Sequence, residues 1–199
     1  MMPRFPLTQI PEIAGRYAYA LEPILTALVP LVQAQGYLTQ HQLFQVCHWK
    51  SARRPDLANA NTPAFVIEIT RFALSATDEQ ARIAPLRLLT GVECPTASAI
   101  LHWFCHDQYP ILDFRAIWSL QVSEDPPLGC GCWQRWLRQH PNAHESPAYC
   151  FTCWLSYVTE WRRLLAQAQQ DRASIVITPR MFDRALWKYS DENQTPNEA

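Results

Sequence analysis

Apolar side chains along this chain recur mostly every three or four residues, which is the spacing of one face of an α-helix. The clearest example is 149–170, where Trp154, Tyr157, Trp161 and Leu164 fall on one face. Read together with start and stop residues, the pattern predicts helices over 16–34, 40–49, 62–74, 78–89, 95–104, 114–120, 133–139, 149–170 and 179–189. We therefore expect an all-α fold.

Residues with strong local preferences divide this pattern. Thr39 and the pair Thr62-Pro63 are typical of helix starts, and Gly36 is typical of a helix end. We expect the first helix to break near Pro23 or Pro30, because proline lacks the N–H that a helix interior needs.

Outside the periodic segments the chain is irregular. Three prolines in the first 15 residues predict an extended arm over 1–15, and the polar end predicts a disordered tail over 190–199. The stretch 121–148 is rich in turn residues. The remaining 16–189 is long enough for one helical domain made of two packed lobes.

Composition supports a helical protein with a real core. Of 199 residues 48% are hydrophobic, with 8 Trp and 5 Gly, which favours helices packed through bulky side chains. The net charge of −1 means that contact with a polyanion requires a local basic patch. The sequence shows neither a signal peptide nor a run of about 18 apolar residues, and its 7 Cys suit free thiols, so we expect a cytoplasmic protein without a membrane segment.

The most informative stretch is LLTGVECPTA at 88–97, followed by YPILD at 109–113. It resembles the helix-hairpin-helix module of DNA glycosylases, whose hairpin has the pattern Leu-Pro-Gly-Val-Gly-x-x-Thr-Ala and is followed at a fixed distance by a catalytic Asp. Asp113 lies 18 residues after Pro95, as that pattern requires. The resemblance is specific over 86–118, the expected hairpin module, and architectural elsewhere.

The resemblance implies a DNA glycosylase-like fold with a central helix-hairpin-helix and DNA as partner. It implies that the hairpin residues Gly91, Val92 and Thr96 hold a phosphate through backbone N–H groups at a helix start. It also implies that Asp113, at the mouth of a cleft between the lobes, stabilises the sugar cation or activates water as the base leaves.

Two further features complete this expectation. The loop carrying Lys50, Arg53 and Arg54 is the densest basic cluster, and we expect it to contact the DNA backbone. Pro95 stands where bifunctional members carry their lysine, so the resemblance implies a monofunctional enzyme without a Schiff-base amine or a cofactor. Glu93 replaces the second hairpin glycine, at a position expected to need a positive φ, and places negative charge beside the phosphate.

Simpler interpretations stand beside these. Asp113 is also a good helix N-cap, and the Gly91-Val92 turn also suits an ordinary αα-hairpin. The alternative function is a non-catalytic helix-hairpin-helix module that binds DNA or a protein partner, which Glu93 and the neutral charge favour.

No metal site is expected. His102 and His106 share a helix face without a third ligand, and the pairs Cys130/Cys132 and Cys150/Cys153 have zinc-like spacing but fall in a glycine loop and on an apolar helix face. Trp49 is expected in the core and Asp183-Arg184 as a surface pair.

Overall fold

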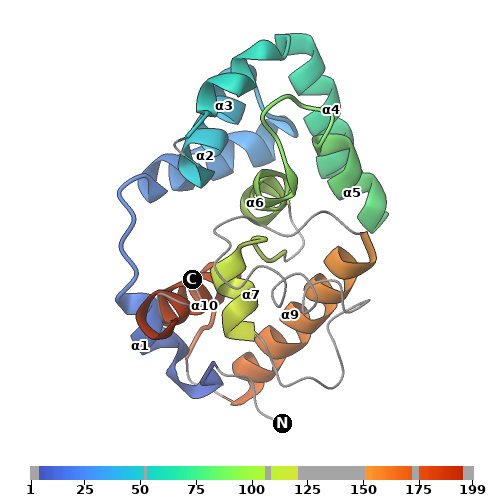
Figure 1. Ribbon diagram of the computed structural model, residues 1–199. Helices are drawn as coiled ribbons and strands as arrows, with labels where there is room; N and C mark the ends of the chain where they lie inside the picture. The colour runs from blue at the N-terminus through green and yellow to red at the C-terminus, as the bar shows by residue number, and fades with distance from the viewer. Residues whose placement is uncertain (1–4, 52, 106–108, 121–150, 172–174, 195–199) are drawn as a thin grey trace. The chain divides into compact units, whose positions relative to one another are not determined.

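The computed structural model describes residues 5–51, 53–105, 109–120, 151–171 and 175–194, and they confirm the all-α class (Figure 1). No strand occurs within these ranges. The described residues fall into two compact units. Unit 2 is continuous, from Tyr19 to Tyr109, whereas unit 1 combines Met1–Ala18 with Pro110–Ala199.

Unit 2 is built around one buried helix. The helices α2, α3 and α5 all contact α6, and α4 packs on α3 and α5. Five consecutive side chains of α6, from Ala97 to Leu101, are almost completely buried, which explains why this helix is apolar nearly all round. The elements of this unit are α2 (Glu22–Gln35), α3 (Gln40–Lys50), the 3-10 helix η2 (Pro55–Ala60), α4 (Pro63–Ser75), α5 (Glu79–Leu86) and α6 (Cys94–Phe104).

Short polar side chains start several of these helices, as expected. Thr39 forms a capping box with Gln42 at the start of α3, and the hydroxyl of Thr62 accepts from the Phe65 N–H at the start of α4. Gly36 ends α2 with a φ of 76°. Pro30 lies inside α2 without ending it, and Pro23 is in its first turn, so the helix expected from Arg16 begins only at Glu22.

Unit 1 joins the start of the chain to its end. Its elements are η1 (Leu7–Gln9), α1 (Ile10–Gly15), α7 (Phe114–Leu120), α9 (Phe151–Asp171) and α10 (Pro179–Asn193). The helix α10 contacts both α1 and α7, and η1 contacts α9. Large aromatic side chains fill this core, including Trp154, Trp161, Tyr157, Phe182 and Phe5.

Two boundary predictions are wrong in this unit. Residues 7–15 are helical rather than extended, because Pro11 is in the first turn of α1, where proline is tolerated, and Ile10 and Ile13 are buried. The tail was expected from residue 190, but α10 continues to Asn193, since Ser190 is buried and its hydroxyl bonds to Gln194. The helix predicted over 133–139 lies outside the described residues. In the described part of the chain, no helix is long and apolar enough to cross a membrane.

Candidate functional site

The turn between α5 and α6 requires a glycine at one position. Gly91 has a φ of 85°, and a Cβ there would lie 2.9 Å from Cβ of Leu57 and 3.2 Å from the Ala58 nitrogen. On either side of it, Leu89 and Val92 are buried, and the Val92 N–H donates to the Leu89 carbonyl. The glycine therefore serves both the left-handed backbone and the close approach of η2.

Asn61, which the sequence analysis did not single out, fixes this turn. Its side-chain amide donates to the carbonyl oxygens of Ala58 and Thr90, both at 2.9 Å, and its oxygen accepts from the Thr90 N–H at 2.8 Å. The thiol of Cys47 lies 3.8 Å from the Gly91 carbonyl oxygen. The turn is thus held by η2 and α3, through contacts that span 29 and 44 residues of chain.

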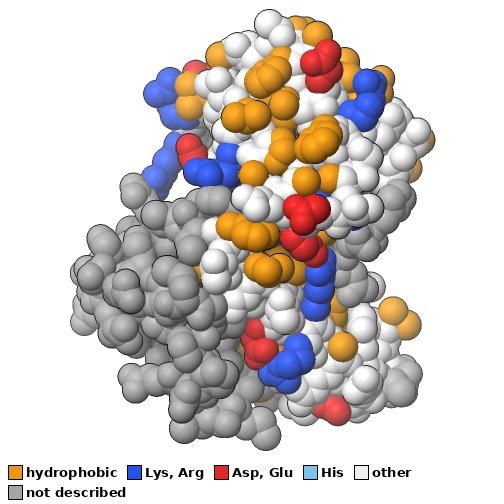
Figure 2. Space-filling view, turned by 90° about the vertical axis from the view of Figure 1, so that its right-hand side faces the viewer, with side chains coloured by type: hydrophobic (Ala, Val, Ile, Leu, Met, Phe, Trp, Pro, Cys, Tyr) orange, Lys and Arg blue, Asp and Glu red, His pale blue; other side chains and the backbone are white. Residues whose placement is uncertain are grey.

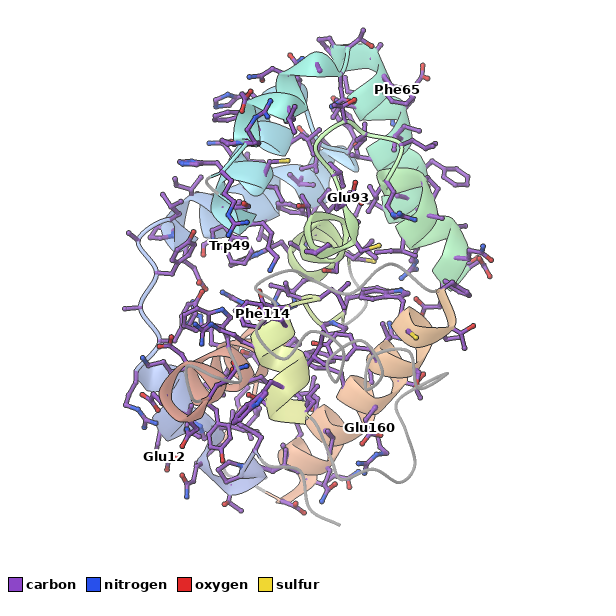
Figure 3. The ribbon with its side chains drawn as sticks, viewed as in Figure 1. Glu12, Trp49, Phe65, Glu93, Phe114 and Glu160 are labelled. Atoms are coloured by element: carbon purple, nitrogen blue, oxygen red, sulfur yellow. The ribbon has the colours of Figure 1, made fainter. Side chains whose placement is uncertain are left out.

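Glu93 precedes the first turn of α6 and is labelled in Figure 3. Its backbone is extended, with φ −92° and ψ 175°, so the expectation of a positive φ at this position is wrong. One left-handed residue, Gly91, suffices to reverse the chain. The Glu93 side chain is 84% exposed, and its carboxylate lies 3.9 Å from the Arg87 guanidinium. A carboxylate beside a helix N-terminus favours the helix but competes with an incoming phosphate.

The other expected hairpin residues are covered. Thr96 is 8% exposed and Val92 2%, so neither side chain is open to a ligand, and the Val92 N–H already donates to the Leu89 carbonyl. Pro95 has no N–H, and the Ala97 N–H donates to the Glu93 carbonyl at 2.8 Å.

The basic loop lies beside η2. Lys50 ends α3, and Arg53 and Arg54 follow it with exposed side chains. The Arg54 guanidinium lies 3.6 Å from Asp56 at the start of η2. Because Leu57 of the same 3-10 helix contacts Gly91, unit 2 connects the loop to the hairpin through η2.

Trp49 is in the core of unit 2, as expected. It is 6% exposed and makes edge-on contacts with Tyr19 and Trp103. Its aromatic ring is therefore not available for stacking on a base.

Asp113 belongs to unit 1 and starts α7. Its Oδ1 accepts from the Arg115 N–H at 3.0 Å, and its backbone carbonyl accepts from the Ile117 N–H at 2.9 Å. The side chain is half-buried. Asp113 is thus the N-cap of α7, and the next residue, Phe114, is labelled in Figure 3.

Side chains of two helices, α9 and α10, hydrogen-bond to the backbone of the segment before Asp113. The Ile111 N–H donates to Oδ1 of Asp183 on α10 at 3.2 Å, and the Ile111 carbonyl accepts from the Tyr157 hydroxyl on α9 at 3.0 Å. Burial raises the pKa of Tyr157 well above its usual value, and the negative charges of Asp183 and Asp113 raise it further. Tyr157 therefore stays protonated and donates at neutral pH.

The prediction that Asp183 and Arg184 form a surface pair is wrong, because Asp183 is buried. Its side chain is 7% exposed and forms an ion pair with Arg180, with 2.5 Å between Oδ2 and Nη1. The spacing of three residues on α10 allows this pair, but only tertiary packing shows that Asp183 is buried.

Arg82 forms a second buried polar network, inside unit 2. Its guanidinium donates to the Ala76 carbonyl, the Cys105 sulfur and the Tyr109 hydroxyl, and that hydroxyl donates to Glu79 at 2.7 Å. This network ties the first half of α5 to Cys105 at the end of α6 and to Tyr109, which is a structural role.

The metal predictions fall partly outside the described residues. His102 places Nδ1 2.6 Å from the Tyr109 carbonyl oxygen, whereas His106 is not among the described residues. Of the four spaced cysteines only Cys153 is described, and it is buried in α9. Within the described ranges, no three or more His, Cys, Asp or Glu side chains are grouped to hold a metal ion.

The structure brings Gly91, Val92, Thr96 and the basic loop into unit 2 and places Asp113 in unit 1.

No protein-family description, curated protein or solved structure matches this chain.

Proposed function

We propose that this protein binds DNA and acts as a monofunctional DNA N-glycosylase, with Asp113 as its carboxylate. The observation that carries the proposal is the support of Asp113: it caps α7 and follows a segment bonded at Ile111 to both Asp183 and Tyr157. A carboxylate stabilises a developing cation best when its position is fixed before the reaction.

In the proposed reaction the bond between C1′ of the deoxyribose and the base nitrogen breaks, and its electron pair leaves with the base. A water oxygen then bonds to C1′ and Asp113 accepts the proton that this water loses; the departing base takes up one proton from solvent, and Asp113 returns its proton to solvent afterwards. The products are a free base and an abasic site. Strand cleavage through a Schiff base is not proposed, because Pro95 supplies no amine at the hairpin.

DNA binding is assigned to unit 2. The start of α6 offers the positive end of an 11-residue helix. The exposed Arg53 and Arg54 come directly before η2, whose Leu57 lies against Gly91 of the hairpin. Both contacts would be to the backbone, which fits a protein that examines many sequences.

A non-catalytic helix-hairpin-helix module is the second candidate. The specific observation in its favour is the Glu93 carboxylate, 84% exposed beside the first turn of α6, where an enzyme of this kind needs phosphate. A module that binds a protein partner through the hairpin would tolerate this charge.

The decisive experiment incubates the protein with duplexes that carry alkylated, oxidised, deaminated or mismatched bases and assays for abasic sites. Asp113→Asn should lower base release by a factor of about a hundred or more, because Asn caps a helix about as well as Asp but carries no charge. Asp78→Asn is the matched control, since Asp78 caps α5 through the same kind of bond, to the N–H groups of Gln80 and Ala81. No release from any duplex by the wild type would leave the binding module as the function.

A further inference from the structure

The chain passes between the two units twice, and at each crossing a single residue separates two neighbours that are anchored in different units. Unit 2 begins at Tyr19 and ends at Tyr109, so the chain crosses between Ala18 and Tyr19 and again between Tyr109 and Pro110. The first crossing can be followed in Figure 1 as the connection between α1 and α2.

Ala18 is the residue between the anchors of the first crossing. In unit 1, the ring of Tyr17 meets that of Trp187 edge-on, with 5.5 Å between the ring centres. In unit 2, the Tyr19 hydroxyl donates to the Trp49 carbonyl at 2.8 Å. Ala18 itself is exposed, and within the described part of the chain its backbone forms no hydrogen bond. Its dihedral angles can therefore change without breaking such a bond.

Pro110 has the corresponding place in the second crossing. Tyr109 is held in unit 2, where its hydroxyl accepts from Arg82 at 2.8 Å and donates to Glu79 at 2.7 Å. Ile111 is held in unit 1 through both its N–H and its carbonyl, which bond to side chains of α10 and α9. Pro110 is buried, and its ring keeps φ near about −65°, so this connection is stiffer than the first.

Two rigid bodies joined at two points keep one rotation relative to each other, about the line through those points. Compact units of one chain move relative to each other unless a large apolar interface locks them together. Hinges use a few residues outside the helices that absorb the change in backbone dihedrals, and small residues are common there. We propose that units 1 and 2 rotate as rigid bodies about an axis through Ala18 and Pro110, with Ala18 absorbing most of the change.

This rotation acts on the candidate site. Asp113 follows Pro110 by three residues and moves with unit 1, whereas Gly91 and the basic loop move with unit 2. A change in the hinge angle therefore changes the distance between the carboxylate and the hairpin. The hinge does not depend on the proposed function, because the same two connections are present in a glycosylase and in a binding module.

Pulsed electron–electron double resonance on the full chain measures this motion, with spin labels on non-natural residues because the chain carries 7 cysteines. Labels at the exposed Gln33 on α2 and Ala166 on α9 span the two units. The control pair, Gln33 and Gln80, lies within unit 2, and α5, which carries Gln80, is on the side that Figure 2 turns to the viewer. A rotation of about 15° displaces an atom ~15 Å from the axis by about 4 Å, so the distance distribution across the units should be about 4 Å wider than that of the control pair.

Variants at Ala18 separate this hinge from other motions. Two glycines inserted after Ala18 release one of the two fixed points, so the distribution across the units should widen beyond that of the wild type. Ala18→Pro fixes φ and should narrow it. The matched control inserts two glycines after the exposed Thr77, in the connection between α4 and α5 inside unit 2, and should leave the distribution across the units unchanged. Thermal unfolding of each variant shows whether it is folded.

Two results would overturn the hinge. The first is a wild-type distribution across the units as narrow as that of the control pair, since the units would then move as one body. The second is an insertion after Ala18 that widens the distribution no more than the insertion after Thr77. These two insertions decide the question even where Ala18→Pro does not fold.

Discussion

The N–H of Ile111 donates a hydrogen bond of 3.2 Å to Oδ1 of Asp183, 72 residues further along the chain. The other oxygen of the same carboxylate pairs with Arg180. Asp183 thus binds the segment that leads to Asp113 and neutralises a cation at the start of α10.

Removing the Asp183 carboxylate should destabilise unit 1 strongly. Asp183→Ala leaves the Arg180 charge and the Ile111 N–H without this acceptor, and we expect a loss of about 3 kcal/mol in the free energy of unfolding. Asp183→Asn keeps one acceptor oxygen and should lose less. Urea denaturation measures both. Glu160→Ala removes a more exposed pair of the same spacing, with Arg163, and should cost less than about 1 kcal/mol. Equal losses at the two sites would contradict this role.

Gly91→Ala should destabilise unit 2 by about 2–4 kcal/mol, because a left-handed backbone and a collision with Leu57 add together. Gly36→Ala is the matched control: its φ is also positive, at 76°, but nothing lies within 4 Å of the added Cβ. That variant should lose only about 1 kcal/mol, the cost of the backbone alone. Thermal unfolding compares them, and a Gly91→Ala protein as stable as Gly36→Ala would mean that η2 moves aside easily.

Glu93→Gln should tighten DNA binding several-fold and steepen its dependence on salt. The change removes a negative charge at the start of α6 and breaks the 3.9 Å ion pair between Glu93 and Arg87. Each additional phosphate contact raises the slope of log affinity against log salt by about 0.9. Fluorescence anisotropy with a labelled duplex measures both quantities, with Asp171→Asn as a control at an exposed acid on α9. Unchanged affinity would remove the hairpin from the DNA-binding surface.

Stability should fall as the solution becomes alkaline, in part through two thiols beside the hairpin. Burial raises the pKa of Cys47 to about 11 and that of Cys94 to about 12. Because the unfolded thiols lose their protons first, near pH 9, the unfolded state gains on the folded state from there up to those values.

At pH 10 the loss should be about 1 kcal/mol per thiol relative to pH 8. The variant Cys47→Ala/Cys94→Ala should lose correspondingly less over the same interval, as measured by urea denaturation at the two pH values. An identical pH dependence in wild type and variant would show that the two thiols are not protected by the fold.

Local signals predicted the helices well where a cap and an apolar face coincide. The helix at Thr62-Pro63 begins where the sequence indicates, since a threonine hydroxyl and a proline in the first turn act within four residues. The arm was missed because proline suits both an extended chain and the first turn of a helix, and only the burial of Ile10 and Ile13 distinguishes the two.

The polar contacts of the candidate site could not be predicted in this way. Asn61 bonds to Thr90 across 29 residues of chain, and Asp183 bonds to Ile111 across 72. No local sequence pattern indicates either pairing. The backbone of Glu93 was predicted wrongly for a related reason. The glycine pattern of the hairpin indicates two residues with a left-handed backbone. In this turn only Gly91 has one, and η2 packs directly against it.

The discontinuity of unit 1 has a consequence for biosynthesis. The helix α1 ends at Gly15, but its packing partner α10 begins only at Pro179, so a ribosome must add about 160 residues before the two can meet. At ~5–20 residues per second this takes roughly ten to thirty seconds, and the whole of unit 2 is synthesised within that interval. Throughout this time Ile10 and Ile13 of the nascent chain lack the α10 side of their core. This makes the short helix α1 a natural segment for a chaperone to cover.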